Sequence, residues 1–237
     1  MKLKQRRIAR STAAAAGPLK CWGGNAMFKE MRVRFCKRGT AVYFSHLDLN
    51  RAVMRALRRS GVPFWSTGGF SPHPYCIFAQ PLSLGFESEG ELFDFRLLEG
   101  AAMNRQALAE AFPEALKVLE IYEPRDAFKE IAYAGYEVDL KTDGSAAEIT
   151  RAFAHPLMIV KKTKRSEQTV DLRAFVREIT VSTSPGAVRL QAVIAAGNER
   201  NLSPNYLAEG LRGAGFSVEF QRVLRRGFYR ADGTAFR

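Results

Sequence analysis

The chain has 237 residues, of which 46% are hydrophobic and 25% charged, an ordinary globular composition that suits one large domain or two small ones. Its formal net charge of +12 favours a polyanionic partner, such as nucleic acid or an anionic membrane surface. No apolar run approaches the ~20 residues of a membrane-spanning helix, so we expect no insertion into a membrane.

The positive charge is concentrated near the start of the chain. Residues 1–30 carry seven basic side chains and one acidic one without apolar periodicity, so we interpret them as a basic disordered leader. The alternatives are an upstream start codon, with Met27 or Met31 as the real start, and an Arg-rich transit peptide. The absence of an apolar h-region argues against an export signal.

The common metal and cofactor motifs are missing from the sequence. Cys21, Cys36 and Cys76 lie far apart and form no CxxC pair, so they offer no thiolate cluster for iron–sulfur or zinc. Phosphate-binding loops of the GxxxxGK[ST] and GxGxxG types are absent as well. We therefore expect no bound metal or cofactor, and reduced thiols in a cytoplasmic protein.

The first half of the chain predicts the order strand, helix, strand, strand, helix, strand. Residues 32–36 alternate polar and apolar side chains, as a half-buried strand does, and residues 46–60 have helical periodicity that Gly61 ends. The remaining elements are expected, in order, as extended segments at 62–66 and 75–79, a strand at 91–98, a helix at 104–112 that Asn104 caps, and a strand at 116–122.

The second half predicts a similar order. We expect strands at 131–140, 157–162, 169–172, 176–182, 188–195 and 216–224, with helices at 145–154 and from Ser203-Pro204 to about 212. Two successive βαββαβ units predict an α+β fold of tandem ferredoxin-like units. The expected boundaries give one unit at 31–124, which carries the polar motifs, and a second at 130–237.

The first polar motif, Ser45-His46-Leu47-Asp48, precedes a predicted helix. A serine followed three residues later by an acid is typical of a capping box, which accounts for Ser45 and Asp48 without a functional role. Capping does not account for His46, whose imidazole at the first helical position can act as an acid, a base or a ligand.

A second motif runs from Gly68 through Phe70, Ser71 and the Pro-His-Pro around His73. The flanking prolines fix the backbone on both sides of His73. One interpretation is a rigid turn in which His73 bonds to a carbonyl. The other is an imidazole presented to phosphate, a base or another protein.

Basic residues form three groups. Arg51, Arg55, Arg58 and Arg59 share the helix face opposite the leucines, which is typical either of a solvated face or of a polyanion-binding one. The other groups lie at 161–165 and at 222–230, where Phe228 and Tyr229 interrupt the basic residues. Basic side chains interleaved with aromatic ones can clamp a nucleic-acid backbone and stack bases.

These motifs resemble those of the radical SAM-linked family, a domain of unknown function. The segments that carry the resemblance are Arg32–Lys37, Phe44–Asp48, Arg58-Arg59, Gly69–Pro74, Pro81–Glu91 and Asp94. The resemblance implies an accessory or substrate-presenting role beside a B12-binding-type radical S-adenosylmethionine (SAM) protein, with RNA as a candidate substrate. Family members commonly have a basic residue after Pro-His-Pro, where Tyr75 stands here. If that basic residue contacts phosphate in the family, the contact is missing or altered in this chain.

We therefore expect a non-catalytic partner of a radical SAM protein that helps to bind or present RNA. The expected working surface consists of Ser45, His46, Asp48, Arg51, Arg55, Arg58, Phe70, Ser71, His73, Tyr75 and Glu87. One alternative is a stand-alone RNA-processing or RNA-modifying enzyme in which His46 and His73 act as acid and base. A pure assembly scaffold is the third hypothesis.

Overall fold

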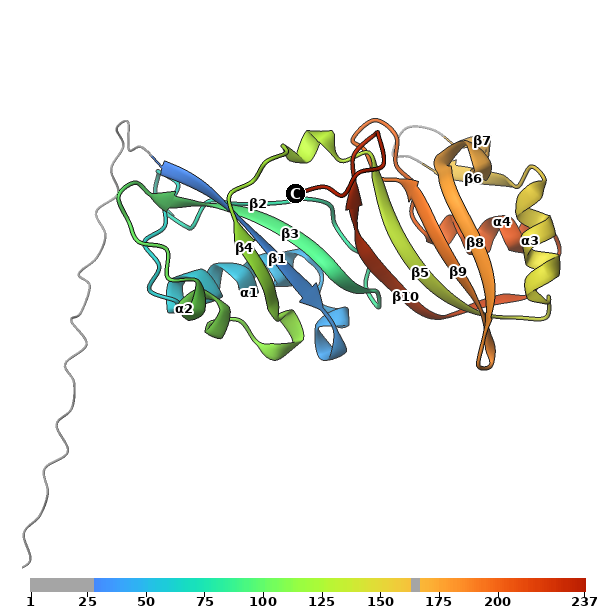
Figure 1. Cartoon of the computed structure of the whole chain (residues 1–237), viewed down its shortest axis with the longest axis horizontal. Helices are drawn as coiled ribbons and strands as arrows, with labels where there is room; N and C mark the ends of the chain where they lie inside the picture. The colour runs from blue at the N-terminus through green and yellow to red at the C-terminus, as the bar shows by residue number, and fades with distance from the viewer. Residues whose placement is uncertain (1–27, 163–166) are drawn as a thin grey trace, which may run out of the picture.

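The computed structural model describes residues 28–162 and 167–237 as a mixed α+β fold around one eight-stranded sheet (Figure 1). The strands are β1 (Phe28–Lys37), β2 (Cys76–Phe78), β3 (Glu87–Leu98), β4 (Val118–Tyr122), β5 (Tyr133–Thr142), β6 (Met158–Lys162), β7 (Glu167–Asp171), β8 (Val176–Ser184), β9 (Ala187–Ala195) and β10 (Val218–Tyr229). The α-helices are α1 (His46–Arg59), α2 (Arg105–Glu110), α3 (Ala146–Ala154) and α4 (Asn205–Gly213). Short 3-10 helices are η1 (Gly39–Tyr43), η2 (Glu114–Leu116), η3 (Phe128–Glu130) and η4 (Leu172–Phe175).

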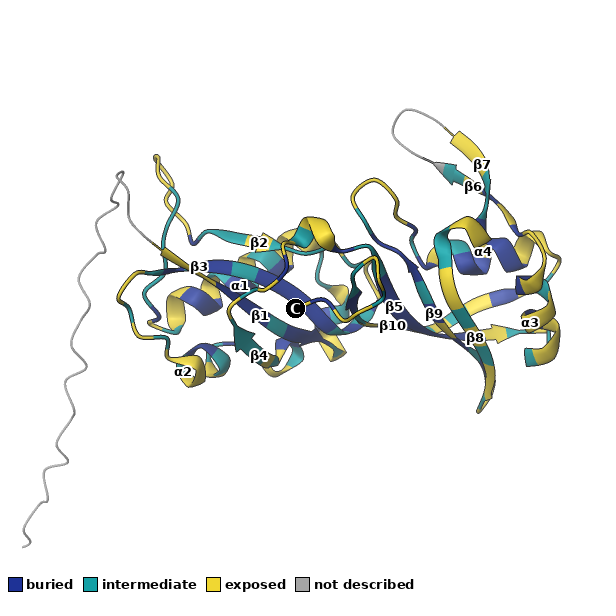
Figure 2. Ribbon diagram, turned by 45° about the horizontal axis from the view of Figure 1, so that its top comes forward, coloured by how far each residue is buried: buried dark blue, intermediate teal, exposed yellow. Residues whose placement is uncertain are grey.

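The first half pairs its strands in the order β4-β1-β3-β2, with every pair antiparallel. Helix α1 buries Leu49, Val53, Ala56 and Leu57 against one face of these strands. The inward positions of β1 and β3 supply the other wall of this core, because alternate residues of a strand point to opposite faces. Figure 2 shows the buried residues along these strands.

The second half repeats this pairing, in the order β10-β5-β9-β8, again with every pair antiparallel. Helices α3 and α4 contribute Ile149, Phe153, Leu207 and Leu211 to its core. Strands β6 and β7 lie outside this order and form a separate two-stranded hairpin. Figure 1 shows the two halves side by side along the long axis of the molecule.

The halves join where β3 and β10 run parallel, at the pairs Leu224↔Glu87 and Arg225↔Ser88. Gly90 lies at this seam, and a Cβ atom there would come within 2.8 Å of the carbonyl oxygen of Arg226 and 2.9 Å of the Cα of Gly227. Both neighbours are backbone atoms, which cannot rotate away. The seam therefore requires glycine at position 90.

Gly90→Ala is expected to lower the free energy of unfolding by about 1–3 kcal/mol, because the added methyl group forces two strand backbones apart. Gly227→Ala is the matched control, since nothing lies within 4 Å of its added Cβ. Urea denaturation of both variants measures the difference. Equal stability of the two variants would contradict this description of the seam.

The structure confirms most of the predicted elements and corrects several boundaries. Strand β1 begins at Phe28, so the last three residues assigned to the leader belong to the sheet; residues 1–27 lie outside the described part. The segment 62–66 forms only isolated bridges, at Phe64 and Ser66, rather than a strand. Helix α4 begins at Asn205, after Pro204, and the Ser203 Oγ accepts a long hydrogen bond, 3.4 Å, from the backbone N–H of Asn205. The residues expected as a strand at 169–172 end at Asp171, where η4 follows.

Candidate nucleic-acid interface

The capping box predicted at the start of α1 is present. The backbone N–H of Asp48 donates to Ser45 Oγ at 3.2 Å, and the backbone N–H and the hydroxyl of Ser45 donate to Asp48 Oδ2 at 3.3 and 2.6 Å. These hydrogen bonds hold the pKa of Asp48 below its usual value. Ser45 and Asp48 therefore shape the helix start, and their polar atoms are engaged with each other.

The same local geometry places His46 on the surface. His46 is exposed, and its ring packs edge-on against Phe78 of β2, with 5.4 Å between the centroids. Tyr43 and Leu47, on either side of it in the chain, are 77% and 57% exposed. Large apolar side chains this exposed at the end of a helix mark a surface available to a partner.

Arginines continue this surface along α1. Arg51, Arg55 and Arg58 are exposed and follow Leu47 at the spacing that keeps side chains on one helix face. Arg51 lies 3.8 Å from the Asp48 carboxylate. Arg55 and Arg58 have no ion-pair partner within residues 28–162 and 167–237. We name the set Tyr43, Leu47, Arg51, Arg55 and Arg58 the α1 stripe.

The loop between Ser66 and Pro74 is closed by a bridge between these two residues. His73 Nδ1 lies 3.0 Å from the carbonyl oxygen of Ser71 and 3.1 Å from Thr67 Oγ1, so the interpretation of a carbonyl-bonded histidine describes this ring. Ser71 is exposed, and Phe70 at the tip of the loop is fully exposed. The loop thus presents an aromatic ring, while the His73 nitrogen Nδ1 is used internally.

The sequence placed Tyr75 on the expected working surface, but this side chain does not continue the exposed loop. It is half-buried beside Arg96, whose guanidinium carbon lies 4.0 Å from the Tyr75 ring centroid and 3.8 Å from that of Phe28. Trp65 packs edge-on against Tyr75, with 5.7 Å between the centroids. Tyr75 therefore belongs to an arginine–aromatic cluster that anchors the loop to the sheet.

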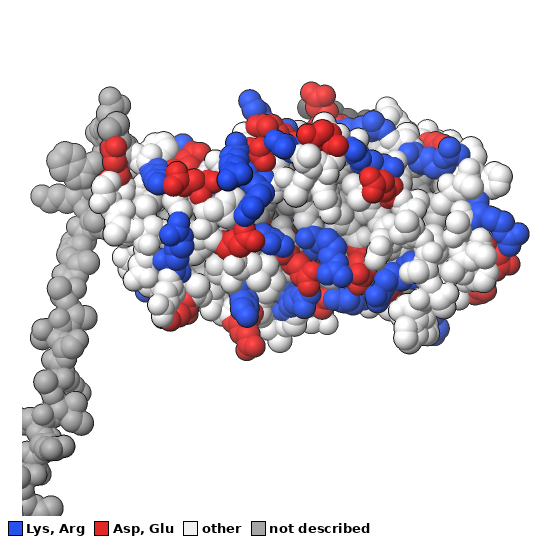
Figure 3. Space-filling model, in the orientation of Figure 1, with Lys and Arg blue, Asp and Glu red and all other residues white. Residues whose placement is uncertain are grey.

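Glu87 lies at the seam between the halves. Its carboxylate accepts from Arg222 Nε at 2.9 Å, and Arg222 also contacts Glu137 at 3.4 Å. Arg226 continues the chain of ion pairs by joining Glu137, at 2.7 Å, to Glu89. Figure 3 shows basic and acidic side chains alternating across this middle part of the molecule. These arginines, for which the sequence left a nucleic-acid clamp and a solvated surface open, are paired with carboxylates.

The histidines predicted as an acid–base pair make separate contacts. His46 packs on Phe78, and His73 bonds to Thr67 and Ser71 within its own loop. Within the described residues no contact joins the two rings. The catalytic roles suggested for His46 and His73 gain no support from this geometry.

Three buried cations escaped the sequence interpretation. Arg32, Lys37 and Arg225 are each at most 1% exposed. Arg32 forms a two-bond pair with Asp94 at 2.7 and 2.8 Å, and Arg225 pairs with Glu91 at 2.6 Å. Arg32 and Lys37 lie in a motif of the resembling family, which was the available signal, whereas Arg225 lies outside those motifs and carried none. Their roles are structural.

Lys37 is less well compensated than the two arginines. Its Nζ donates to the carbonyl oxygen of Val42 at 3.3 Å, and burial lowers its pKa below the usual 10.5, although the Glu91 carboxylate opposes the shift. Burial also raises the pKa of the Cys76 thiol to about 12, so this cysteine is inert as a nucleophile at neutral pH.

Among the described residues, no group of three or more His, Cys, Asp and Glu side chains could hold a metal ion. Likewise, no helix in the described ranges is long and apolar enough to cross a membrane. Cys21 and most of the basic group at 161–165 lie outside the described residues.

The fold and the site define an α+β protein whose motif residues are divided among α1, the loop between Ser66 and Pro74, and the seam between the halves. Residues 30–204 match the model of a family described as an uncharacterized protein conserved in bacteria (DUF2344), and the chain belongs to this family. The match agrees with the expectation of a domain of unknown function. No curated protein matches the chain.

Two solved structures are similar to the chain at low identity. One is a chain in the crystal structure of a Cbf5-Nop10-Gar1 complex, with 12% identity and a TM-score of 0.47 over 82% of this chain and 47% of that chain. This protein thus spans about half the length of that chain. The other is the crystal structure of an unknown protein from Galdieria sulphuraria, with 12% identity and a TM-score of 0.21 over 82% of this chain and 98% of that one.

Proposed function

We propose that this protein is a cytoplasmic, non-catalytic accessory of a radical SAM enzyme and that it binds single-stranded RNA along α1 for presentation to that enzyme. The α1 stripe carries this proposal. It combines an exposed tyrosine and leucine with three exposed arginines on a rigid helix. The radical SAM partner is part of this proposal because the motifs between Arg32 and Asp94 resemble those of the radical SAM-linked family.

The spacing of the stripe supports a nucleic-acid ligand. Successive helical turns rise ~5.4 Å, so Arg51, Arg55 and Arg58 offer guanidinium groups at intervals close to those of phosphates along a nucleic-acid strand. Tyr43 lies at the end of η1, three residues before α1 begins, and its exposed ring is available to stack on a base. A surface of this kind binds backbone and bases without reading their sequence.

The proposal includes tandem ferredoxin-like units as the scaffold. Support comes from the pairing orders β4-β1-β3-β2 and β10-β5-β9-β8, in which each half places its first and third strands at the centre. In the first unit the helices cover one sheet face, and α1 turns its arginine row outward. The division at 31–124 and 130–237 stays a prediction.

The test is RNA binding by the full chain and by an Arg55→Glu/Arg58→Glu variant. Loss of two phosphate contacts is expected to weaken binding of a single-stranded RNA at least tenfold and to reduce the salt slope of log K by about 1–2. Filter retention at several salt concentrations gives both quantities. Both side chains are exposed, so the fold is expected to persist.

A matched control separates the stripe from net charge, including that of residues 1–27. Lys141→Glu/Arg151→Glu changes the charge equally at exposed positions of the second half. This control is expected to weaken binding much less than the α1 variant. If both double variants bind RNA equally well, the α1 stripe is not the interface.

A further inference from the structure

A cavity of about 320 Å³ opens at the seam, where β1, β3 and β4 of the first half meet β10 and the C-terminal segment. We name it the seam cavity. Its charged lining residues are Arg34 of β1, Glu120 of β4, Arg226 of β10 and Arg237. Volumes of ~300–1,000 Å³ are typical of small-molecule sites. The seam cavity shares no residue with the α1 stripe.

The charged lining of the seam cavity has more cations than anions. Arg34 Nη1 donates to Glu120 Oε1 at 3.2 Å, and Arg237 Nη2 donates to Glu120 Oε2 at 2.9 Å. One carboxylate thus holds two guanidinium groups close together, and both keep N–H donors that bond to no described residue. Such donors favour a tetrahedral anion, because each can form a charge-assisted hydrogen bond with it.

Arg226 brings a third guanidinium group to the seam cavity, from the second half. It pairs with Glu137 at 2.7 Å and with Glu89, and neither carboxylate lines the cavity. Glu89 is also the partner of Arg38, and Glu137 also accepts from Arg222 at 3.4 Å. Because each carboxylate is shared with another arginine, neither fully offsets the charge of Arg226.

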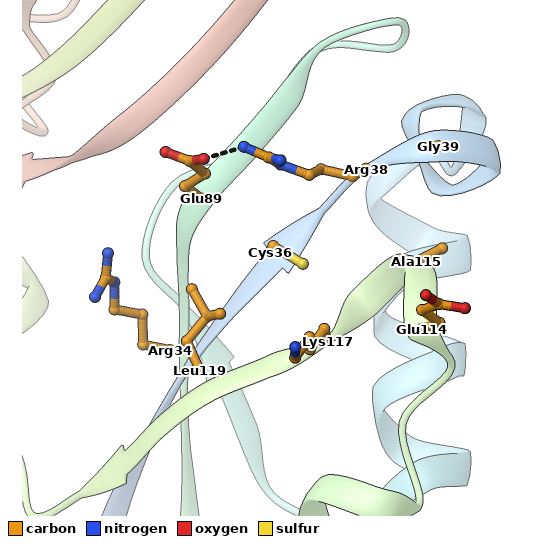
Figure 4. A pocket seen from close by; sticks show the side chains of 9 residues that line it. All are labelled: Arg34, Cys36, Arg38, Gly39, Glu89, Glu114, Ala115, Lys117 and Leu119. Carbon is orange, nitrogen blue, oxygen red and sulfur yellow. Dashed lines mark hydrogen bonds and ion pairs between the residues drawn. The ribbon is translucent and has the colours of Figure 1, made fainter.

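The direction of Arg34 supports its assignment to the seam cavity. Arg34 also lines a larger cavity, of about 610 Å³, on β1 and β4 (Figure 4). Figure 4 shows the Arg34 side chain directed away from Lys117 and Glu114, which belong to that larger cavity. Its carboxylate partner, Glu120, lines the seam cavity and not the larger one. The guanidinium group of Arg34 is therefore available to a ligand at the seam.

Apolar and aromatic residues complete the lining. Leu92, Phe228 and Phe236 are buried and line the same cavity as the arginines. Apolar walls lower the local dielectric constant, so an ion pair beside them is stronger than one in open water. Tyr122 adds a hydroxyl group that makes no hydrogen bond within residues 28–162 and 167–237 and can donate to an anion.

We propose that the seam cavity binds a phosphate monoester, with the phosphate between Arg34, Arg226 and Arg237. A monoester carries a charge of about −1.5 to −2 at pH 7, which suits a lining of three arginines and one carboxylate. A phosphodiester carries less charge and suits this lining less well. The monoester belongs either to a small molecule or to the 5′ end of an RNA, and the site is independent of the α1 stripe.

The test is isothermal titration of the full chain with methyl phosphate and, separately, with dimethyl phosphate. Methyl phosphate is expected to bind about tenfold more tightly, because the diester has lost charge and a charge-assisted contact. An oligoribonucleotide with a 5′-phosphate or a 5′-hydroxyl identifies the source of the monoester. It is titrated into the Arg55→Glu/Arg58→Glu chain, so that the α1 stripe does not contribute. The ligand is an RNA end if the 5′-phosphate form binds more tightly than methyl phosphate, and a small molecule if it does not.

Removal of two cations tests the contacts. Arg34→Gln/Arg237→Gln is expected to weaken the binding of methyl phosphate about tenfold, because two charge-assisted contacts are lost. Lys141→Gln/Arg151→Gln is the control, since it removes the same charge at exposed positions of the second half and is expected to leave binding unchanged.

Removal of the carboxylate has the opposite sign. Glu120→Gln is expected to strengthen the binding of methyl phosphate severalfold, because the carboxylate no longer competes for Arg34 and Arg237. Glu209→Gln makes the same change of charge at an exposed position of α4 and is expected to have no effect. The proposal is overturned if methyl phosphate does not bind, if dimethyl phosphate binds as tightly, or if either variant behaves like its control.

Discussion

Arg225→Met is expected to lower the free energy of unfolding by about 3–5 kcal/mol, because it leaves a buried carboxylate without its counter-ion. Arg225 is 1% exposed and Glu91 is 3% exposed. The guanidinium Nη2 donates to both Glu91 oxygens at 2.6 Å and to the carbonyl oxygen of Gln80 at 2.9 Å. One side chain of β10 thus binds both β3 and the segment that leads into it.

Urea denaturation of three variants tests this. The double variant Arg225→Met/Glu91→Leu removes the pair and is expected to recover only part of the lost stability, since the buried Lys37 then loses the favourable charge of Glu91. Arg222→Met is the control, because its side chain is 37% exposed and its pairs are expected to contribute less than about 1 kcal/mol. A loss below about 1 kcal/mol for Arg225→Met would contradict a buried pair at this seam.

The sequence predicted the elements whose determinants are local. Ser45 caps α1 through a residue three positions ahead, and Ser145 does the same for α3 through Glu148. Asn104 caps α2, also as predicted, by accepting from the backbone N–H of Ala107. Each signal lies within one helical turn, so it can be read without knowing the fold.

The buried charges had no such local signal. Arg32 and Asp94 are 62 positions apart, and Arg225 and Glu91 are 134 positions apart. A charged residue in a sequence is interpreted as exposed because burial without a partner is costly, and the partner becomes apparent only when the strands pair. The basic run 222–230 was for this reason interpreted as exposed, either as a binding surface or as a solvated one, although Arg225 within it is a buried anchor.

The same difference between local and long-range determinants applies to the expected working surface. The exposed arginine row of α1 followed from helical periodicity alone, and Arg55 and Arg58 lie where that periodicity placed them. Tyr75 packs against Arg96, and Glu87 pairs with Arg222 at the seam. In both cases the partner lies far away in the sequence. The cavity on β1 and β4 escaped the sequence interpretation altogether, because its walls come from three separate segments.

The second large effect is expected for Asp94→Ala, which leaves the guanidinium of Arg32 buried without its carboxylate. Arg32 is 0% exposed, and its guanidinium carbon lies 4.3 Å from the Phe128 ring centroid and 4.8 Å from that of Phe236. Its Nη1 has no hydrogen-bond partner among the described residues, and its Nε and Nη2 both donate to Asp94. We expect a loss of about 3–5 kcal/mol in the free energy of unfolding.

The position of Arg32 gives this variant a local effect as well. Phe236 belongs to the C-terminal segment, where its backbone N–H donates to the carbonyl oxygen of Phe228 at 3.0 Å. If the unpaired guanidinium moves toward water, the two rings lose their cation and the segment is held less firmly. Hydrogen exchange at Phe236 is expected to accelerate more than exchange in α4.

Glu120→Ala is the control for the loss of stability, because this carboxylate is 41% exposed and its pairs with Arg34 and Arg237 contribute little. Equal stability of the two variants would show that the Arg32–Asp94 pair adds no more than a surface pair.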